Sequence, residues 1–371
     1  MARTPAAGLV LRRPTGIWTG RNVLDVHDRD PAAAGGHYLA LSGRKVAEHR
    51  CLSGDFGERF PAAPAQPGGA PGCSRISFRR ADRRRRCLGE KPRIAERMMV
   101  PLEDEFGDLV GKSRRGHGLS VEDLAGETGI DAEALSAFEG YRRDPTREQS
   151  DTLAGRLGLD AAKLWEIAAG TWAPDAVEPS IAGGFEIQSL WYGPDRVWAY
   201  VIGDAANCVL IDAGVPEEDL RSAIGERELA AVLLTHTHGD HISALGAIVG
   251  GTDIAVHVPA EELGAVAGLG GEAHSFADGE VLQAGPFEFK VLHTPGHTAG
   301  ESCLAVGDVV FTGDALFAGS IGGTNLGVDA FPVHKQTVRD KVLALQGSTK
   351  LFPGHGPQTT VAEELAHNPF F

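Results

Sequence analysis

The stretch Thr235–His241 reads THTHGDH. Within six positions it places three histidines and one aspartate, namely His236, His238, His241 and Asp240. Zinc, iron and manganese accept imidazole nitrogens and carboxylate oxygens as ligands, and a core strand would not bury so many polar groups unpaired. The preceding run Ala230–Leu234 is apolar and typical of a buried strand. The motif is therefore predicted to lie on the loop at the carboxyl end of a strand, where open α/β sheets place their chemistry.

Three further candidate ligands follow later in the chain, each directly after a glycine. They are His297 in HTPGHT (293–298), Asp314 in VVFTGDALF (309–317) and His355 in LFPGHG (351–356). A single histidine is more often an ordinary core or surface residue than a ligand, but so many candidates at the ends of apolar or turn segments reverse that expectation. Glycine allows the backbone to approach a metal closely, so the repeated arrangement predicts one metal site built from several loops.

From about residue 185 to the C-terminus, the sequence resembles the metallo-β-lactamase fold, and within it the hydroxyacylglutathione hydrolase (glyoxalase II-like) branch. The HxHxDH pattern carries the resemblance, together with HTPGHTAGESCLAV, FTGDALFAGSIGGTN, LFPGHGPQTT and the terminal HNPFF. The resemblance implies an α/β fold class, with an αββα sandwich over residues 183–371.

The resemblance also implies a ligand set. One metal ion would be held by His236, His238 and His297, a second by Asp240, His241 and His355, and Asp314 would bridge the two. Asp212 ends the strand-like run Val209–Ile211 and matches a family aspartate that shapes the metal loop. A turn residue at the end of a strand is an equally good interpretation of Asp212.

The ligands predict the chemistry of the site. Two divalent ions, with zinc as the first choice and iron or manganese as alternatives, lower the pKa of a bound water from about 15.7 towards 7. The hydroxide would attack a carbonyl polarised by one ion, and Asp240 would orient it or carry its proton. The predicted activity is that of a metal-dependent hydrolase, and the predicted substrate is a small-molecule thioester or a related activated acyl compound.

Two observations bear on alternatives within the superfamily. His236, His297 and Asp314 also suit a mononuclear iron triad, similar to that of the persulfide dioxygenases.

Many members of the hydrolase branch carry a GRTD segment, where this chain reads Gly322-Gly323-Thr324-Asn325. The exchange removes a cation and an anion beside the site without removing a ligand. The nearest basic residues in the sequence are interpreted as the solvated face of an amphipathic helix: His334, Lys335, Arg339 and Lys341.

Composition bounds the class of protein. The chain has 371 residues, of which 42% are hydrophobic, which suits two or three domains with buried cores. No apolar run reaches the roughly 18 residues that span a membrane, and the N-terminus does not resemble a secretory signal. The five cysteines are scattered without CxxC spacing. They predict neither a disulfide framework nor a zinc finger, and favour a cytoplasmic location.

Residues 1–98 differ from the rest in composition. They are rich in proline, glycine, alanine and arginine, as in PAAPAQPGGAPG (61–72) and RRADRRRR (79–86), and they are basic, whereas the remainder is strongly acidic. No helical or strand period is sustained, so a disordered basic extension is expected. The methionines of the chain are Met1, Met98 and Met99. The hypothesis is that translation starts at Met98 or Met99, and the alternative is a basic arm that touches nucleic acid.

Residues 101–172 predict a small all-α domain. Helices are expected from Phe106, after the capping pair Ser120 and Asp123, and over the ranges Ala132–Phe138, Arg147–Leu157 and Ala161–Ala169. The run LSVEDLAGETGIDAEALSAFEGYRRDPTREQSDTLAGRLGLDAAKLWEIA resembles the phage-repressor-like (XRE family) helix-turn-helix domains.

A helix-turn-helix reads bases with the second helix of its pair, which here is predicted over Asp131–Glu139. That helix offers Asp131, Glu133, Ser136 and Glu139, without the arginine, lysine or amide side chains that read bases. Basic residues flank it, namely Lys112, Arg114, Arg115, Arg142, Arg143 and Arg147. Weak DNA contact stays open, and a role in homodimer formation or protein docking is preferred. Two hypotheses for the whole chain therefore stay open. It is either a metallo-hydrolase with a helical accessory domain or a DNA-binding regulator with a metal-containing sensor domain.

Overall fold

The computed structural model describes residues 100–181, 184–193, 196–324 and 326–371, which belong to one compact unit. The predicted basic extension, the start-site hypothesis and Asn325 lie outside the described residues. Among the described helices, none has the length and apolar character needed to cross a membrane.

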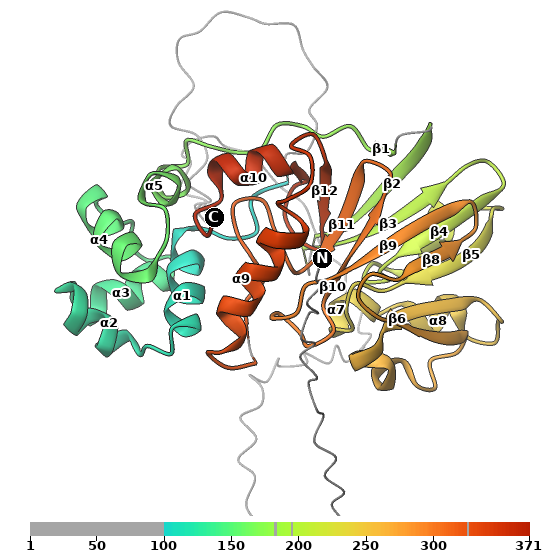
Figure 1. Cartoon of the computed structure of the whole chain (residues 1–371), viewed down its shortest axis with the longest axis horizontal. Helices are drawn as coiled ribbons and strands as arrows, with labels where there is room; N and C mark the ends of the chain where they lie inside the picture. Colours follow the sequence, from blue (N-terminus) through green and yellow to red (C-terminus); the bar gives the residue numbers. More distant parts are fainter. Residues whose placement is uncertain (1–99, 182–183, 194–195, 325) are drawn as a thin grey trace, which may run out of the picture. The chain divides into compact units, whose positions relative to one another are not determined.

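Five short helices open the described chain (Figure 1): α1 (Phe106–Gly116), α2 (Val121–Thr128), α3 (Ala132–Glu139), α4 (Arg147–Leu157) and α5 (Ala161–Ala169). We call them the helical module. Ser120 caps α2 by accepting from the backbone N–H of Asp123, whose carboxylate accepts from the Ser120 N–H in return. Gly158 ends α4 in the left-handed conformation. Because such signals are local, the predicted helices Arg147–Leu157 and Ala161–Ala169 are confirmed to the residue.

One feature of α3 contradicts the sequence interpretation. The sequence predicts that Glu139 is available to a partner of α3, and this prediction is wrong. Its Oε1 and Oε2 each accept at 2.7 Å from the guanidinium of Arg114 in α1, and the two side chains are 16% and 11% exposed. The forked pair holds α3 on α1, while Asp131 and Glu133 stay exposed.

A seven-stranded sheet follows, in the order β1-β2-β3-β4-β5-β6-β7. Its strands are β1 (Ser180–Ile181), β2 (Phe185–Tyr192), β3 (Val197–Gly203), β4 (Asn207–Ile211), β5 (Glu228–Leu233), β6 (Ala255–Pro259) and β7 (Glu272–Phe276). Strands β1 to β4 pair antiparallel, and β4 to β7 pair in parallel. The parallel connections carry α6 (Glu217–Ile224), α7 (Gly239–Ile242), α8 (Leu245–Val249) and the 3₁₀ helix η1 (Ala260–Val266).

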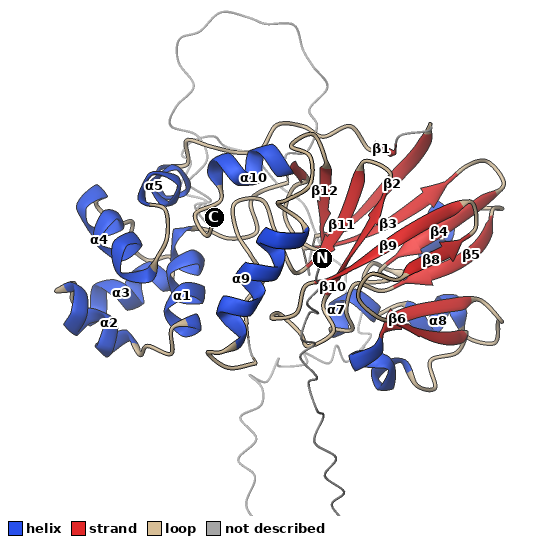
Figure 2. Ribbon diagram, in the orientation of Figure 1, coloured by secondary structure: helices blue, strands red, loops and turns tan. Residues whose placement is uncertain are grey.

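A six-stranded sheet completes the sandwich, in the order β13-β12-β11-β10-β9-β8 (Figure 2). Its strands are β8 (Val281–Ala284), β9 (Phe287–His293), β10 (Ser302–Val306), β11 (Val309–Gly313), β12 (Lys350–Pro353) and β13 (Thr359–Thr360). The parallel pair β11–β12 is joined through α9 (Ala330–Lys341), and α10 (Val361–His367) follows β13.

Three clusters of buried apolar side chains define the layers. Ile187 of β2 and Phe289 of β9 belong to the cluster between the two sheets. Leu220 of α6 belongs to the cluster on the outer face of the first sheet, and Val338 of α9 to the cluster on the outer face of the second. Burial of these faces drives the layering. The predicted αββα sandwich is confirmed.

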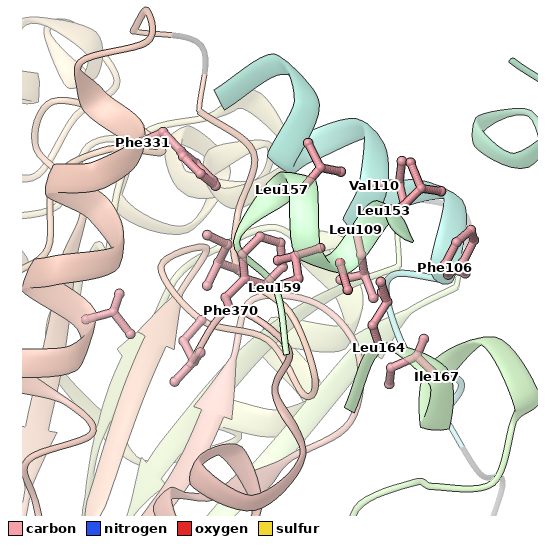
Figure 3. Close-up of a cluster of buried hydrophobic side chains, with 14 of the residues drawn as sticks. Phe106, Leu109, Val110, Leu153, Leu157, Leu159, Leu164, Ile167, Phe331 and Phe370 are labelled. Atoms are coloured by element: carbon pink, nitrogen blue, oxygen red, sulfur yellow. The ribbon is translucent and has the colours of Figure 1, made fainter. Parts of the chain in front are cut away.

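The third cluster continues into the helical module. Leu109 of α1 and Leu164 of α5 share it with Phe331 of α9 and with Phe370 near the C-terminus (Figure 3). At Gly116, a Cβ would lie 2.3 Å from the Phe331 ring, so only glycine fits this contact. The module therefore packs on the sandwich through a continuous apolar core.

Candidate metal centre

The structure brings all seven predicted ligands together from four loops. His236 and His238 follow β5, with Asp240 and His241 in the short helix α7. His297 lies between β9 and β10, Asp314 directly after β11, and His355 two residues after β12. His236 and His241 are fully buried and His238 is exposed, so the cluster is open to solvent beside His238.

The seven side chains form two groups. The ligand atoms of His236, His238, His297 and Asp314 all lie within 4.8 Å of one another, as do those of Asp240, His241 and His355. Asp314 faces both groups, because its Oδ2 lies 3.3 Å from His297 Nε2 and its Oδ1 lies 3.3 Å from His241 Nε2. This is the division, with Asp314 between, that the family resemblance implied.

Hydrogen bonds at the outer nitrogen orient the rings of His241, His297 and His355. Their Nδ1 atoms bond to Asp212 Oδ2 at 2.9 Å, to the Gly323 oxygen at 2.8 Å and to the Arg196 oxygen at 2.9 Å. Each acceptor assigns the Nδ1 proton and turns Nε2 towards the cluster.

Two of the facing atoms lack hydrogen-bond partners. Within the described part of the chain, the buried His236 Nε2 and Asp314 Oδ1 have no hydrogen-bond partner. Buried acceptors that face one another are costly unless a cation lies among them. The residues therefore fit the divalent metal that the ligand set implies.

The charges of the cluster agree with this fit. Burial would raise the pKa of Asp314, but His241 and His355 hold it well below its usual value. Burial would lower the pKa of His241, but Asp314 and Asp212 raise it well above 6.5. The carboxylates of the cluster thus favour positive charge at this position, which a divalent cation would supply in place of a proton.

Asp212 holds the loop that carries the first ligands. Its Oδ1 accepts from the N–H of Thr235 and its Oδ2 from the Thr235 hydroxyl, both at 2.9 Å, in addition to His241. Its φ of +55° lies in the left-handed region that non-glycine residues rarely adopt. Of the two interpretations left open for Asp212, the geometry supports the residue that shapes the metal loop.

Two glutamates that the sequence interpretation missed support the ligands. Glu262 of η1 accepts from the N–H and hydroxyl of Thr237 at 2.6 and 2.7 Å, from the Thr298 hydroxyl, and from the N–H of Gly300 at 3.1 Å. It thereby joins the loop of His236 and His238 to that of His297. Glu301 is fully buried and accepts from the N–H of Asp314 at 3.1 Å. The position of Glu301 directly before the apolar strand β10 could have indicated a buried, functional carboxylate. No comparable sequence signal marks Glu262.

The glycines before the candidate ligands leave room for neighbouring side chains, including other candidate ligands. A Cβ on Gly354 would lie 2.4 Å from Asp314 Oδ1, and one on Gly313 would lie 2.4 Å from Glu301 Oε1. At Gly296, where φ is +147°, a Cβ would lie 2.2 Å from the Cβ of His334.

His334 contradicts the interpretation of the basic residues of α9 as a solvated face, whereas Arg339 is exposed as that interpretation expects. The His334 side chain is fully buried and its Nε2 donates to the Ala315 oxygen at 2.9 Å. Burial lowers its pKa to about 4, so the ring is neutral and structural. Lys341 is also engaged, through Asp278 and the His293 oxygen.

Comparison with known proteins places this site in a family. The Metallo-beta-lactamase superfamily matches residues 192–355, which contain all seven predicted ligands. The Probable metallo-hydrolase YqgX of Bacillus subtilis is 35% identical over 198 residues, 48% of this chain and 93% of that protein. The Hydroxyacylglutathione hydrolase GloC of Haemophilus influenzae is 33% identical over 187 residues, 45% of this chain and 88% of that protein.

Among solved structures, ETHE1 from Myxococcus xanthus is 32% identical, with a TM-score of 0.44, over 49% of this chain and 83% of that one. The similarity to the curated relatives extends over nearly their whole length. The chain belongs to the metallo-β-lactamase superfamily, and the curated relatives that it matches include proteins named as metallo-hydrolases.

Proposed function

We propose that this protein is a dinuclear metal-dependent hydrolase that cleaves a small-molecule thioester. His236, His238 and His297 would hold one ion, Asp240, His241 and His355 the other, and Asp314 would bridge them. When bound, two divalent cations, with zinc as the first choice, act as Lewis acids and lower the pKa of water towards neutrality. The full set of seven convergent side chains carries the proposal.

The second group of side chains favours two ions over one. In a mononuclear site built from His236, His297 and Asp314, the rings of His241 and His355 would have no metal ion to bind. Both rings are nevertheless oriented by outer hydrogen bonds, to Asp212 and to the Arg196 oxygen. Such outer hydrogen bonds are typical of ligating histidines. The dioxygenase alternative gives these two rings no role.

Asp240 has the position of a residue that handles the nucleophile. Its Oδ2 lies 3.4 Å from His355 Nε2, and this partner lowers the pKa of the carboxyl group. The side chain is 38% exposed. An ionised carboxylate on the open side can orient a water and accept its proton.

The substrate class rests on similarity and on the chemistry. GloC, which is named a hydroxyacylglutathione hydrolase, is 33% identical to this chain over 88% of its own length. A thioester carbonyl is activated enough for attack without a serine or cysteine nucleophile. The two cysteines among the described residues, Cys208 and Cys303, are buried, and burial raises the pKa of both thiols, so neither suits nucleophilic attack.

A substrate screen tests the proposal. The full chain loaded with zinc, manganese or iron is assayed against acyl thioesters, lactones and persulfides. The expected result is thioester hydrolysis that is lost on chelation and restored by metal. Oxygen consumption with a persulfide by the iron form, without thioester hydrolysis, would establish the mononuclear dioxygenase instead.

DNA contact and a homodimer remain predictions of the sequence. Asp131 and Glu133 stay exposed on α3, and carboxylates there would oppose phosphates. Arg114 is engaged with Glu139, which removes one of the flanking cations. A gel shift with the gene's upstream DNA at stated salt, and the molar mass in solution, test the two predictions.

A further inference from the structure

The loop Asp314–Gly323 connects the two groups of ligands to the helical module. It begins at the carboxylate that faces both groups and ends at the carbonyl that accepts from His297 Nδ1 at 2.8 Å. The loop contains Gly319, Gly322 and Gly323, and glycine confers little stiffness of its own. The position of the Gly323 carbonyl therefore depends on what holds the loop from outside.

The helical module holds this loop directly. Lys112 of α1 donates from Nζ to the Ile321 oxygen at 2.9 Å, and the same Nζ lies 5.1 Å from the centre of the Phe317 ring. At Gly319, a Cβ would lie 2.8 Å from the ring of Trp172 and 3.1 Å from Ile167. The module, together with Trp172 just after α5, thus contacts the loop at Phe317, Gly319 and Ile321.

Lys112 is a fixed group rather than a surface cation. Its side chain is 14% exposed and is paired with Asp104, which is 7% exposed. A charge-assisted bond to a carbonyl in such a half-buried place is stronger than a neutral one. The Phe317 ring under the ammonium also packs edge-on against the His355 ring, with centroids 5.7 Å apart. Lys112 therefore acts on segments that contact both groups of ligands.

The segment before α1 supports the second group in the same way. Arg196 donates to the Leu102 oxygen at 2.7 Å, and its own carbonyl oxygen accepts from His355 Nδ1 at 2.9 Å. The ion pair of Arg196 with Glu103 adds to this contact. His297 therefore donates its outer hydrogen bond to a loop that the module contacts, and His355 donates its own to Arg196, which the segment just before α1 holds.

We infer that the helical module supports the metal centre by holding the loop Asp314–Gly323, and that Lys112 is a positioning residue for His297. Lys112 fixes the Ile321 carbonyl, which stands two residues before the Gly323 carbonyl that orients the imidazole. The inference rests on the proposed dinuclear site, since it concerns the geometry of a ligand. It assigns the module a part in building the site, whatever other partner the module binds.

Cobalt binding tests this role without an activity assay. The cobalt-loaded full chain is titrated with a chelator of known affinity, and its visible spectrum reports the ligand geometry. Lys112→Met is expected to weaken cobalt binding about tenfold, as changes around outer hydrogen bonds of ligating histidines do, and to alter the spectrum. Lys112→Arg, which keeps the charge and donors, is expected to restore most of both.

Lys163→Met is the matched control. Lys163 of α5 also donates from the module to a backbone oxygen of the sandwich, that of Leu365, at 2.8 Å. This hydrogen bond is to α10 and not to the loop Asp314–Gly323. Cobalt binding should change less than twofold in this variant. If Lys112→Met does not fold, Lys112→Gln replaces it in the same comparison.

Two results would overturn the inference. One is a folded Lys112 variant with unchanged cobalt affinity and spectrum, and the other is an equal loss in the Lys163 control. Failure of the wild-type chain to bind cobalt at all would instead contradict the proposed function, and this is seen before any variant is made.

Discussion

At the scale of single residues, Asp314 is the side chain on which the proposed site depends most. Its Oδ1 lies 3.3 Å from His241 Nε2, and its Oδ2 lies 3.3 Å from His297 Nε2 and 3.6 Å from His355 Nε2, so the carboxylate faces both groups. Asp314→Ala is expected to abolish turnover and to lower the metal content, because the bridge and a ligand are lost together. Metal analysis and a turnover assay measure both, with Asp253→Ala as an exposed carboxylate control. Full activity in Asp314→Ala would refute the bridging role.

Asp240 differs from Asp314 because it lies on the open side. Asp240→Asn keeps the volume and removes the charge, so we expect turnover to fall by a factor of about 10² to 10⁴ with little change in the melting temperature. Steady-state kinetics and thermal unfolding of the same preparation separate the two effects. A variant that turns over substrate like the wild type would remove Asp240 from the mechanism.

At the scale of elements, η1 supplies the residue that joins two ligand loops. Glu262 accepts four hydrogen bonds, from Thr237, Thr298 and Gly300. In Glu262→Gln the amide nitrogen cannot accept, so donors are left unpaired at a cost of about 1–3 kcal/mol, and metal affinity is expected to fall 10- to 100-fold. The exposed neighbour Glu261 gives the control Glu261→Gln. Equal metal affinity in the two variants would contradict the joining role.

Helix α10 contributes a pH dependence of stability. Burial raises the pKa of Glu364 to about 7, although its carboxylate accepts from Asn368, Thr359 and Gly319. Since the folded pKa exceeds the unfolded value near 4.5, this group's contribution to stability is full below about 4.5 and is lost as the pH rises to about 7. The loss is on the order of 3 kcal/mol.

Glu364→Gln cannot ionise and should lack this component. Urea unfolding at pH 5 and pH 7.5 measures the difference between the wild type and the variant at each pH. We expect the wild type to lose stability relative to the variant between the two values. A difference that does not change with pH would show that Glu364 does not titrate in this window.

The elements also show which parts of the structure the sequence could predict. The bounds of α4 and α5 were predictable because Thr146 and Asp160 cap them and Gly158 and Gly170 end them, all within a few residues. The convergence of the candidate ligands was predictable because each directly follows a strand or a turn. The burial of His334 was not, because its partner Ala315 lies in a loop 19 residues away in sequence.

At the scale of the whole molecule, contacts between segments distant in sequence could not be predicted from any motif. The Arg114–Glu139 pair and the Lys112 contact with the Ile321 oxygen depend on which faces of α1 meet α3 and the ligand loop. Periodicity indicates that a helix has an apolar face but does not identify the surface that the face covers. The predicted αββα sandwich followed from motifs, whereas the shared core of the helical module and the second sheet required the structure.

The most direct measurement is the metal stoichiometry of the full chain after equilibrium dialysis against zinc, read by elemental analysis. Two ions per chain are predicted, with Asp314→Ala binding fewer. Protein that stays free of metal after dialysis against zinc, iron and manganese in turn would contradict the account, since the seven convergent side chains would then serve another purpose.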